Sequence, residues 1–152
     1  LKEIFVSNEE LLALDVDILI PAAMENVITA DNVSKVKAKI ILELANGPVN
    51  SAADEILDQN DVLVIPDILG NAGGVTVSYF EWAQNNSGFY WDLSEVHQKL
   101  QWTMSREFLH VHQLSEAYKI SMRTAAYVHA LTRLNESILA QGTRRYFADE
   151  MV

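Results

Sequence analysis

Three short segments contain the residue types that could bind a ligand, and each one follows an apolar run. They are the Ala22-Ala23 pair, the Asn46-Gly47 pair and the Gly-Asn-Ala-Gly-Gly segment at residues 70–74. Small residues leave room for a flat group to approach the backbone, and asparagine side chains can hydrogen-bond a ligand. A single segment of this kind is weak evidence, because tight strand-to-helix packing also uses small residues. Three of them indicate a binding site if they meet at one place.

Each of these segments ends a stretch that has the composition of a buried strand. The stretches at residues 15–21, 38–45 and 61–65 are short, apolar and bounded by turn residues. Helical patterns start at Ser7 or Asn8, at residue 29, and at Ser51, where Ser51 and Asp54 are placed like a capping pair. Strands that alternate with short helices predict a parallel sheet with right-handed crossovers. The carboxyl ends of such strands share one edge, where open α/β folds bind ligands.

The second half of the chain has a different character. A polar, hinge-like segment at residues 84–88 and an aromatic cluster at 89–91 precede two long helical patterns. Apolar residues recur every three or four positions between residues 94 and 118, and a second stripe runs from residue 121 to 142. Because a short turn joins the two predicted helices, we expect them to pack antiparallel.

The bulk composition excludes several classes of protein. The 152 residues are 49% hydrophobic, enough for one sizeable core, and the lack of cysteine excludes disulfides, thiolate metal sites and cysteine catalysis. A net charge of −10 argues against nucleic-acid partners, whose phosphates attract basic surfaces. No apolar run approaches the roughly 20 residues of a membrane span, and the first residues lack the basic flank of a signal peptide. We therefore expect a soluble, cytoplasmic protein without membrane contacts.

The histidines do not suggest a metal site. His110 and His112 are two positions apart on a predicted helix, about 200° around its axis, so they cannot share an ion. His97 and His129 stand alone in the sequence. The chain also lacks the HExxH, paired-cysteine and GxSxG patterns of metalloproteases, zinc sites and serine hydrolases. We expect packing or surface roles for the histidines and no bound metal.

Two carboxylates and the glycine-rich segment lack the partners that catalysis or phosphate binding requires. Glu43 and Asp67 lie beside predicted strands, but no base accompanies them, and Asp67 is interpreted as a turn or cap residue. The glycine-rich segment at 70–74 is predicted to be a loop, but it contains neither GxGxxG nor the Gly-Lys-Ser/Thr that a phosphate loop requires. If this sheet binds a dinucleotide, it supplies the nicotinamide-facing side and lacks the pyrophosphate cradle.

Four longer stretches resemble one family. Residues 17–26, 45–48 and 66–82 closely resemble the C-terminal half of the glutamate dehydrogenases, in the family shared with leucine, phenylalanine and valine dehydrogenases. The Met-Arg-Thr-Ala-Ala-Tyr stretch at 122–127 resembles the terminal helical segment of the same enzymes. The resemblance extends to about residue 142, and the tail at 143–152 departs from the pattern and receives no role.

The resemblance implies a fold and an activity. The fold is α/β: the second half of a doubly wound parallel, Rossmann-like sheet followed by long C-terminal helices. Residues 1–85 would form a partial dinucleotide-binding domain and residues 86–152 a helical segment. The implied activity is NAD(P)-dependent oxidative deamination of L-glutamate to 2-oxoglutarate and ammonium, in a hexamer with the active-site cleft between two domains.

The resemblance also assigns roles to residues. Cofactor contacts fall on five positions: Ala22, Ala23, Asn46, Asn71 and Gly73. Val75 would pack on the aliphatic part of the substrate, and Ser78 would hydrogen-bond its side-chain carboxylate. A hydroxyl suits that task, since it adds a donor without burying another charge.

The family's catalytic lysine and aspartate and its GxGxxG loop are expected before residue 1, in the rest of the same subunit. We therefore predict that the isolated chain is inactive, and that its uncovered sheet edge promotes self-association. A non-catalytic binding or regulatory module of the same fold is an alternative. A leucine, phenylalanine or valine dehydrogenase is another, although an apolar pocket would leave the Ser78 hydroxyl without a carboxylate partner.

Overall fold

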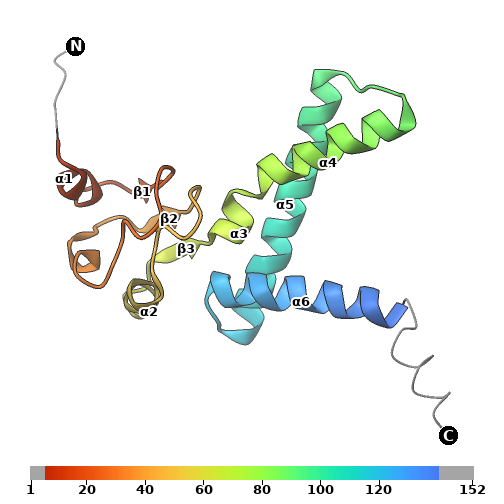
Figure 1. Ribbon diagram of the computed structural model, residues 1–152. Helices are drawn as coiled ribbons and strands as arrows, with labels where there is room; N and C mark the ends of the chain where they lie inside the picture. Colours follow the sequence, from red (N-terminus) through yellow and green to blue (C-terminus); the bar gives the residue numbers. More distant parts are fainter. Residues whose placement is uncertain (1–5, 141–152) are drawn as a thin grey trace, which may run out of the picture.

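The computed structural model describes residues 6–140 and has an α/β fold, with a small parallel sheet followed by long helices (Figure 1). The predicted fold class is confirmed. In chain order the elements are α1 (Asn8–Leu12), β1 (Ile18–Leu19), the 3-10 helix η1 (Val33–Lys35), β2 (Ile40–Leu42), α2 (Ser51–Gln59), β3 (Leu63–Ile65), α3 (Asp67–Gly70), α4 (Ala72–Ser87), α5 (Leu93–Tyr118) and α6 (Met122–Ala140).

The sheet has the order β1-β2-β3, and both pairs of neighbours are parallel. Ile40 in β2 is paired with Ile18 on one side and Leu63 on the other. All three predicted strands are present, but each is shorter than its apolar run. Pro21 and Pro66 follow β1 and β3 and donate no ladder hydrogen bond, which limits the strands at their carboxyl ends.

The helix starts follow their capping residues. Ser7 caps α1 in a reciprocal capping box with Glu10, as its position in the sequence predicts. The predicted capping pair Ser51 and Asp54 is wrong, because Asn50 caps α2 and its side chain accepts a hydrogen bond from the amide of Ala53 at 2.8 Å. The carboxylate of Asp54 is thereby left for another partner.

The glycine-rich segment at 70–74 is helical, which corrects its interpretation as a loop. Gly70 ends α3, Asn71 is the joint, and α4 begins at Ala72. A Cβ atom on Gly70 would lie 2.5 Å from the carbonyl oxygen of Glu43, so glycine is required here by the approach of α3 to the end of β2. The polar segment at 84–88 is not a hinge either, because α4 continues to Ser87 and Gly88 caps it with a φ of 66°.

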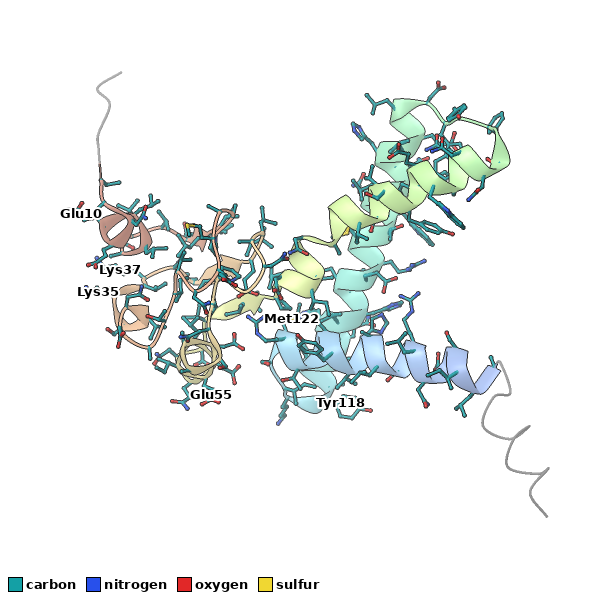
Figure 2. The ribbon with its side chains drawn as sticks, in the orientation of Figure 1. Glu10, Lys35, Lys37, Glu55, Tyr118 and Met122 are labelled. Carbon is teal, nitrogen blue, oxygen red and sulfur yellow. The ribbon has the colours of Figure 1, made fainter. Side chains whose placement is uncertain are left out.

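The described residues form two hydrophobic cores. The first lies between the sheet and its crossovers and contains Ile28, Val33, Ile41, Val49, Ala53 and Leu57. The second joins α3, α5 and α6 and contains Leu69, Val111, Met122, Ala125 and Ala126, with Ile65 of β3 packed against it. Figure 2 shows Met122 at the start of α6, where that helix meets the end of the sheet. The predicted division at residue 85 falls in the last turn of α4.

The helices α5 and α6 pack against each other near the turn that joins them and then diverge (Figure 1). The two helices cross steeply in this view, so the expected antiparallel packing is wrong. Lys119 ends α5 in the left-handed conformation, with a φ of 52°. None of the described helices is both long enough and apolar enough to cross a membrane.

Candidate functional site

The carboxyl edge of the sheet brings two asparagines together. Asn46 follows β2 and Asn71 follows α3, and Nδ2 of Asn71 donates a hydrogen bond of 2.7 Å to Oδ1 of Asn46. Asn71 stands at the N-cap of α4, yet its side chain does not cap that helix. Within the described chain, Oδ1 of Asn71 and Nδ2 of Asn46 make no hydrogen bond. One acceptor and one donor at this edge can thus bind a ligand.

Ala22 and Ala23 lie at the end of β1 and are exposed. They line a hollow of about 550 Å³, together with Leu19 of β1, Leu12 of α1 and Val27. Neither asparagine is among the lining residues of that hollow. The structure therefore places the alanines at the same edge of the sheet as Asn46 and Asn71, in a hollow of their own that an apolar, flat group could enter.

Gly73, Val75 and Ser78 belong to α4. The side chain nearest to Gly73 is that of Leu100 in α5, 3.9 Å from the position of a Cβ atom. Val75 is 70% exposed, and the exposed Ser78 is three positions further on, so the two share one face of the helix. The hydroxyl of Ser78 donates to the carbonyl of Gly74 at 3.1 Å. The predicted cofactor and substrate contacts of these residues stay predictions.

Arg123 is the residue that the sequence interpretation missed. Its guanidinium lies 2.8 Å from a carboxylate oxygen of Glu43, 2.8 Å from one of Asp54 and 3.4 Å from one of Asp67. Glu43 also accepts a hydrogen bond from the amide of Asp67, and Asp67 accepts one from the amide of Gly47. The network ties α6 to the ends of β2 and β3. It also fixes the backbone at Gly47, next to Asn46, through the hydrogen bond from the Gly47 amide to Asp67.

The charge state of this network follows from its hydrogen bonds. Burial lowers the pKa of Arg123, but hydrogen bonds to Asp54 and Glu43 and the charges of those carboxylates raise it above its usual value. Arg123 is therefore a permanent cation. The interpretation of Asp67 as a cap or turn residue is incomplete, since its carboxylate links two strand ends. Two acidic residues beside buried strands were the available signal that a basic partner was needed.

His129 does not stand alone, contrary to the expectation from the sequence. Its Nε2 atom lies 2.8 Å from Oε2 of Glu107, and Arg133 and Arg106 contact the same carboxylate. Burial raises the pKa of Glu107, but the hydrogen bonds from His129 and Arg106 and the charges of Arg106 and Arg133 lower it below its ordinary value. This cluster lies between α5 and α6, outside the carboxyl edge of the sheet.

Comparison with known proteins adds independent information. The sequence pattern of the family described as Glutamate/Leucine/Phenylalanine/Valine dehydrogenase matches residues 2–142. The chain belongs to this family. An NADP-specific glutamate dehydrogenase of Synechocystis sp. is 56% identical over 144 residues, which cover 95% of this chain and 34% of that protein. A cryptic catabolic NAD-specific glutamate dehydrogenase of Bacillus subtilis is 47% identical over 137 residues, which cover 90% and 32%.

A solved structure of this dehydrogenase family has the same fold. The hetero-hexameric glutamate dehydrogenase from Thermus thermophilus, in a leucine-bound form, matches with a TM-score of 0.84 at 32% identity. The match covers 90% of this chain and 33% of that one. The chain thus spans about a third of the length of the family members it matches. The resemblance drawn from the sequence alone is confirmed.

Proposed function

We propose that this chain forms the C-terminal portion of an NAD(P)-dependent glutamate dehydrogenase and supplies contacts to cofactor and substrate. The pair of Asn46 and Asn71 carries the proposal, because two amides with unused hydrogen-bonding atoms lie at the edge where α/β folds bind ligands. The similarity to NADP-specific and NAD-specific glutamate dehydrogenases supports the choice of reaction. That reaction converts L-glutamate, NAD(P)⁺ and water to 2-oxoglutarate, ammonium, NAD(P)H and a proton.

The residues at the sheet edge fit the nicotinamide side of such a cofactor. When bound, the cofactor accepts the hydride that leaves the α-carbon of glutamate. Oδ1 of Asn71 and Nδ2 of Asn46 match the donor and acceptor of a carboxamide or the hydroxyls of a ribose. Ala22 and Ala23 offer a surface without large side chains. Gly73, two positions after Asn71, has no side chain that could obstruct the cofactor. A pyrophosphate cradle is absent from this sequence, so that part of the cofactor binds elsewhere in the subunit.

Val75 and Ser78 are proposed to recognise the side chain of glutamate. Their shared face on α4 presents an apolar group beside a hydroxyl, which suits methylene groups that end in a carboxylate. The hydroxyl of Ser78 donates to the Gly74 carbonyl and can rotate toward a carboxylate instead, since a hydroxyl has a single proton. A leucine, phenylalanine or valine side chain would leave this donor without its charged partner.

The catalytic lysine and aspartate are proposed to come from the rest of the subunit, and the complete enzyme is proposed to be a cytoplasmic hexamer. The hetero-hexameric state of the Thermus thermophilus relative supports a six-subunit assembly. On this proposal the isolated chain produces no NAD(P)H from L-glutamate. Detectable production by the purified chain would overturn that part of the proposal.

A chimeric enzyme tests the function directly. Residues 2–142 of this chain replace the matching segment of the Synechocystis sp. enzyme, whose remaining sequence supplies the other domain. We expect NADPH formation, followed by absorbance, that depends on L-glutamate and is much weaker with L-leucine, L-phenylalanine or L-valine. A chimera that assembles like the parent enzyme but turns over none of these amino acids would favour a non-catalytic module. Preference for an apolar amino acid would contradict the proposed substrate.

A further inference from the structure

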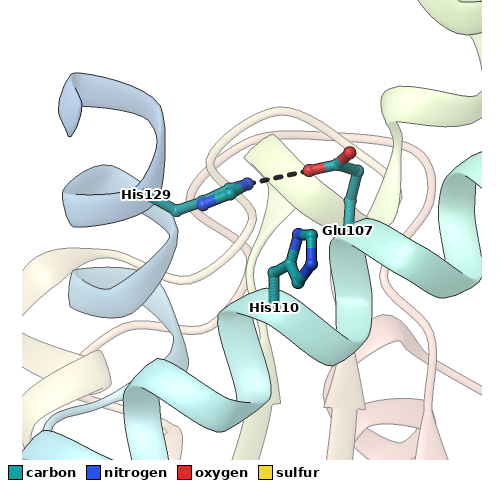
Figure 3. Close-up of side chains that lie close together, drawn as sticks. All are labelled: Glu107, His110 and His129. Atoms are coloured by element: carbon teal, nitrogen blue, oxygen red, sulfur yellow. Dashed lines mark hydrogen bonds and ion pairs between the residues drawn. The ribbon is translucent and has the colours of Figure 1, made fainter. Parts of the chain in front are cut away.

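Glu107, His110 and His129 gather between α5 and α6, and none of them belongs to the carboxyl edge of the sheet (Figure 3). Glu107 and His110 are three positions apart on α5, so they share one face of that helix. His129 reaches them from α6, with Nε2 2.8 Å from Oε2 of Glu107. The ring centroids of His110 and His129 are 5.4 Å apart. Two helices thus bring three metal-ligating side chains to one point.

We propose that these three side chains form a binding site for a divalent transition-metal ion of the Zn²⁺ type. Each residue offers one ligand atom, and these atoms all lie within 4.8 Å of one another. Zinc takes imidazole nitrogen and carboxylate oxygen at about 2.0–2.2 Å, which places two tetrahedral ligands roughly 3.4 Å apart. Small side-chain rotations therefore close the site around an ion. Three protein ligands with an open fourth position are a common arrangement for zinc.

The two arginines beside Glu107 contact different oxygens of its carboxylate. Arg106 donates to Oε1, the oxygen that does not face His129, and its guanidinium also lies 4.3 Å from the ring centroid of Trp102. Arg106 therefore orients the carboxylate from outside while Oε2 remains available as a ligand. Arg133 competes for Oε2 at 3.3 Å, but its side chain is 61% exposed. An exposed ion pair of this kind is weak, so Arg133 can turn into water.

An ion at this point would join α6 to α5. Arg123 lies earlier on α6 and holds the ends of β2 and β3 through Glu43 and Asp67. The ion would therefore stabilise the helix that anchors the carboxyl edge of the sheet. The site itself does not depend on the proposed function, because none of the residues proposed to contact the cofactor or the substrate contributes a ligand.

Titration of the purified 152-residue chain with Zn²⁺, by isothermal titration calorimetry, tests the proposal. We expect one ion per chain and a Tm that rises with Zn²⁺ concentration, because the ion binds the folded state. The substitution His110→Ala is decisive, since His110 is exposed and its loss does not disturb the core. Loss of a partner outside the ligand set costs about 10–100-fold in metal affinity. Loss of His110, a ligand itself, should therefore weaken Zn²⁺ binding by more than about tenfold. His129→Ala and Glu107→Gln should act in the same direction.

His97→Ala is the matched control, because His97 is also exposed on α5 but lies outside the cluster. It should leave Zn²⁺ affinity unchanged, and in the NMR spectrum the imidazole signals of His110 and His129 should shift on Zn²⁺ addition while that of His97 stays. Three results overturn the proposal: no binding by the folded chain, binding that His110→Ala does not weaken, or an equal loss with His97→Ala. In each of these cases the cluster is only a hydrogen-bonded contact between helices.

Discussion

The guanidinium of Arg123 lies 2.8 Å from the carboxylate of Glu43, although 80 positions separate the two residues in the sequence. Glu43 is fully buried at the end of β2, and Arg123 is in the first turn of α6. Asp54 of α2 and Asp67 of α3 contact the same guanidinium. A single cation therefore holds the sheet, its crossover helix and the C-terminal helices in one arrangement.

Replacing Arg123 with methionine should destabilise the fold strongly. Removing one partner of a buried ion pair leaves the carboxylate of Glu43 without compensation, which costs about 3–5 kcal/mol. Urea unfolding followed by circular dichroism measures the change in the free energy of unfolding. Arg133→Met is the control on the same helix, and its exposed ion pair should contribute less than about 1 kcal/mol. Equal losses in the two variants would show that the buried network is not what stabilises the fold.

Gly70→Ala and Gly74→Ala should change stability in opposite directions. The added Cβ on Gly70 meets the Glu43 carbonyl oxygen at 2.5 Å, and such overpacking costs about 1–3 kcal/mol. No atom lies within 4 Å of a Cβ on Gly74, where alanine should gain about 0.5–1 kcal/mol as a better helix former. Thermal unfolding of both variants provides the measurement. A stable Gly70→Ala variant would mean that α3 does not pack closely against β2.

Asn71→Ala should weaken cofactor binding in the chimeric enzyme with little change in Tm, because the amide pairs with Asn46 and caps no helix. Loss of one hydrogen bond between uncharged groups, about 0.5–1.5 kcal/mol, corresponds to a KM for NADP⁺ that rises roughly two- to tenfold. Initial rates at varied NADP⁺ provide the measurement. Asn86→Ala, on an exposed position of α4, is the control and should leave this KM unchanged. An unaltered KM in Asn71→Ala would remove Asn71 from the cofactor site.

Ser78→Ala should raise the KM for L-glutamate in the chimera. A hydrogen bond to a charged group is worth about 1.5–3 kcal/mol, so kcat/KM should fall by roughly ten- to a hundredfold. Ser137→Ala removes a serine whose hydroxyl makes the same kind of bond, to the carbonyl of Arg133 at 2.9 Å, and serves as the control. If both variants keep the parental kcat/KM, then Ser78 only bonds its own helix.

Ile18→Lys should reduce self-association of the isolated chain. Ile18 lies in the edge strand β1 and is 52% exposed, and charged residues block the pairing of open edges. Light scattering coupled to size-exclusion chromatography should show a shift toward the monomer mass of 17.1 kDa. Leu139→Lys is the control and changes a residue of similar exposure, 59%, at the far end of α6. An equal shift with that control would move the contact from the sheet edge to the helices.

Local patterns in the sequence were sufficient for the order of the elements. Alternating apolar runs and capping residues predicted the parallel sheet, and the stripe at residues 94–118 predicted α5. Such patterns depend on neighbours within a turn or a strand, so they can be read without a structure. The same patterns predict a loop at residues 70–74, which is wrong, because Gly70 ends α3 and α4 begins at Ala72. Glycine is required at position 70 because the carbonyl oxygen of Glu43 comes close to it. The residues adjacent to Gly70 in the sequence do not reveal that contact.

By itself, then, the sequence determined the fold class, the family and the positions of Asn46 and Asn71 at strand ends. Only the tertiary structure decided which polar groups meet. The contact of Arg123 with Glu43 depends on how α6 crosses β3, and that of His129 with Glu107 on how α6 packs against α5. These crossings are set by apolar contacts such as those of Val111 with Ala125 and Met122. Residue spacing fixes the faces of a helix, whereas packing between helices fixes which faces meet.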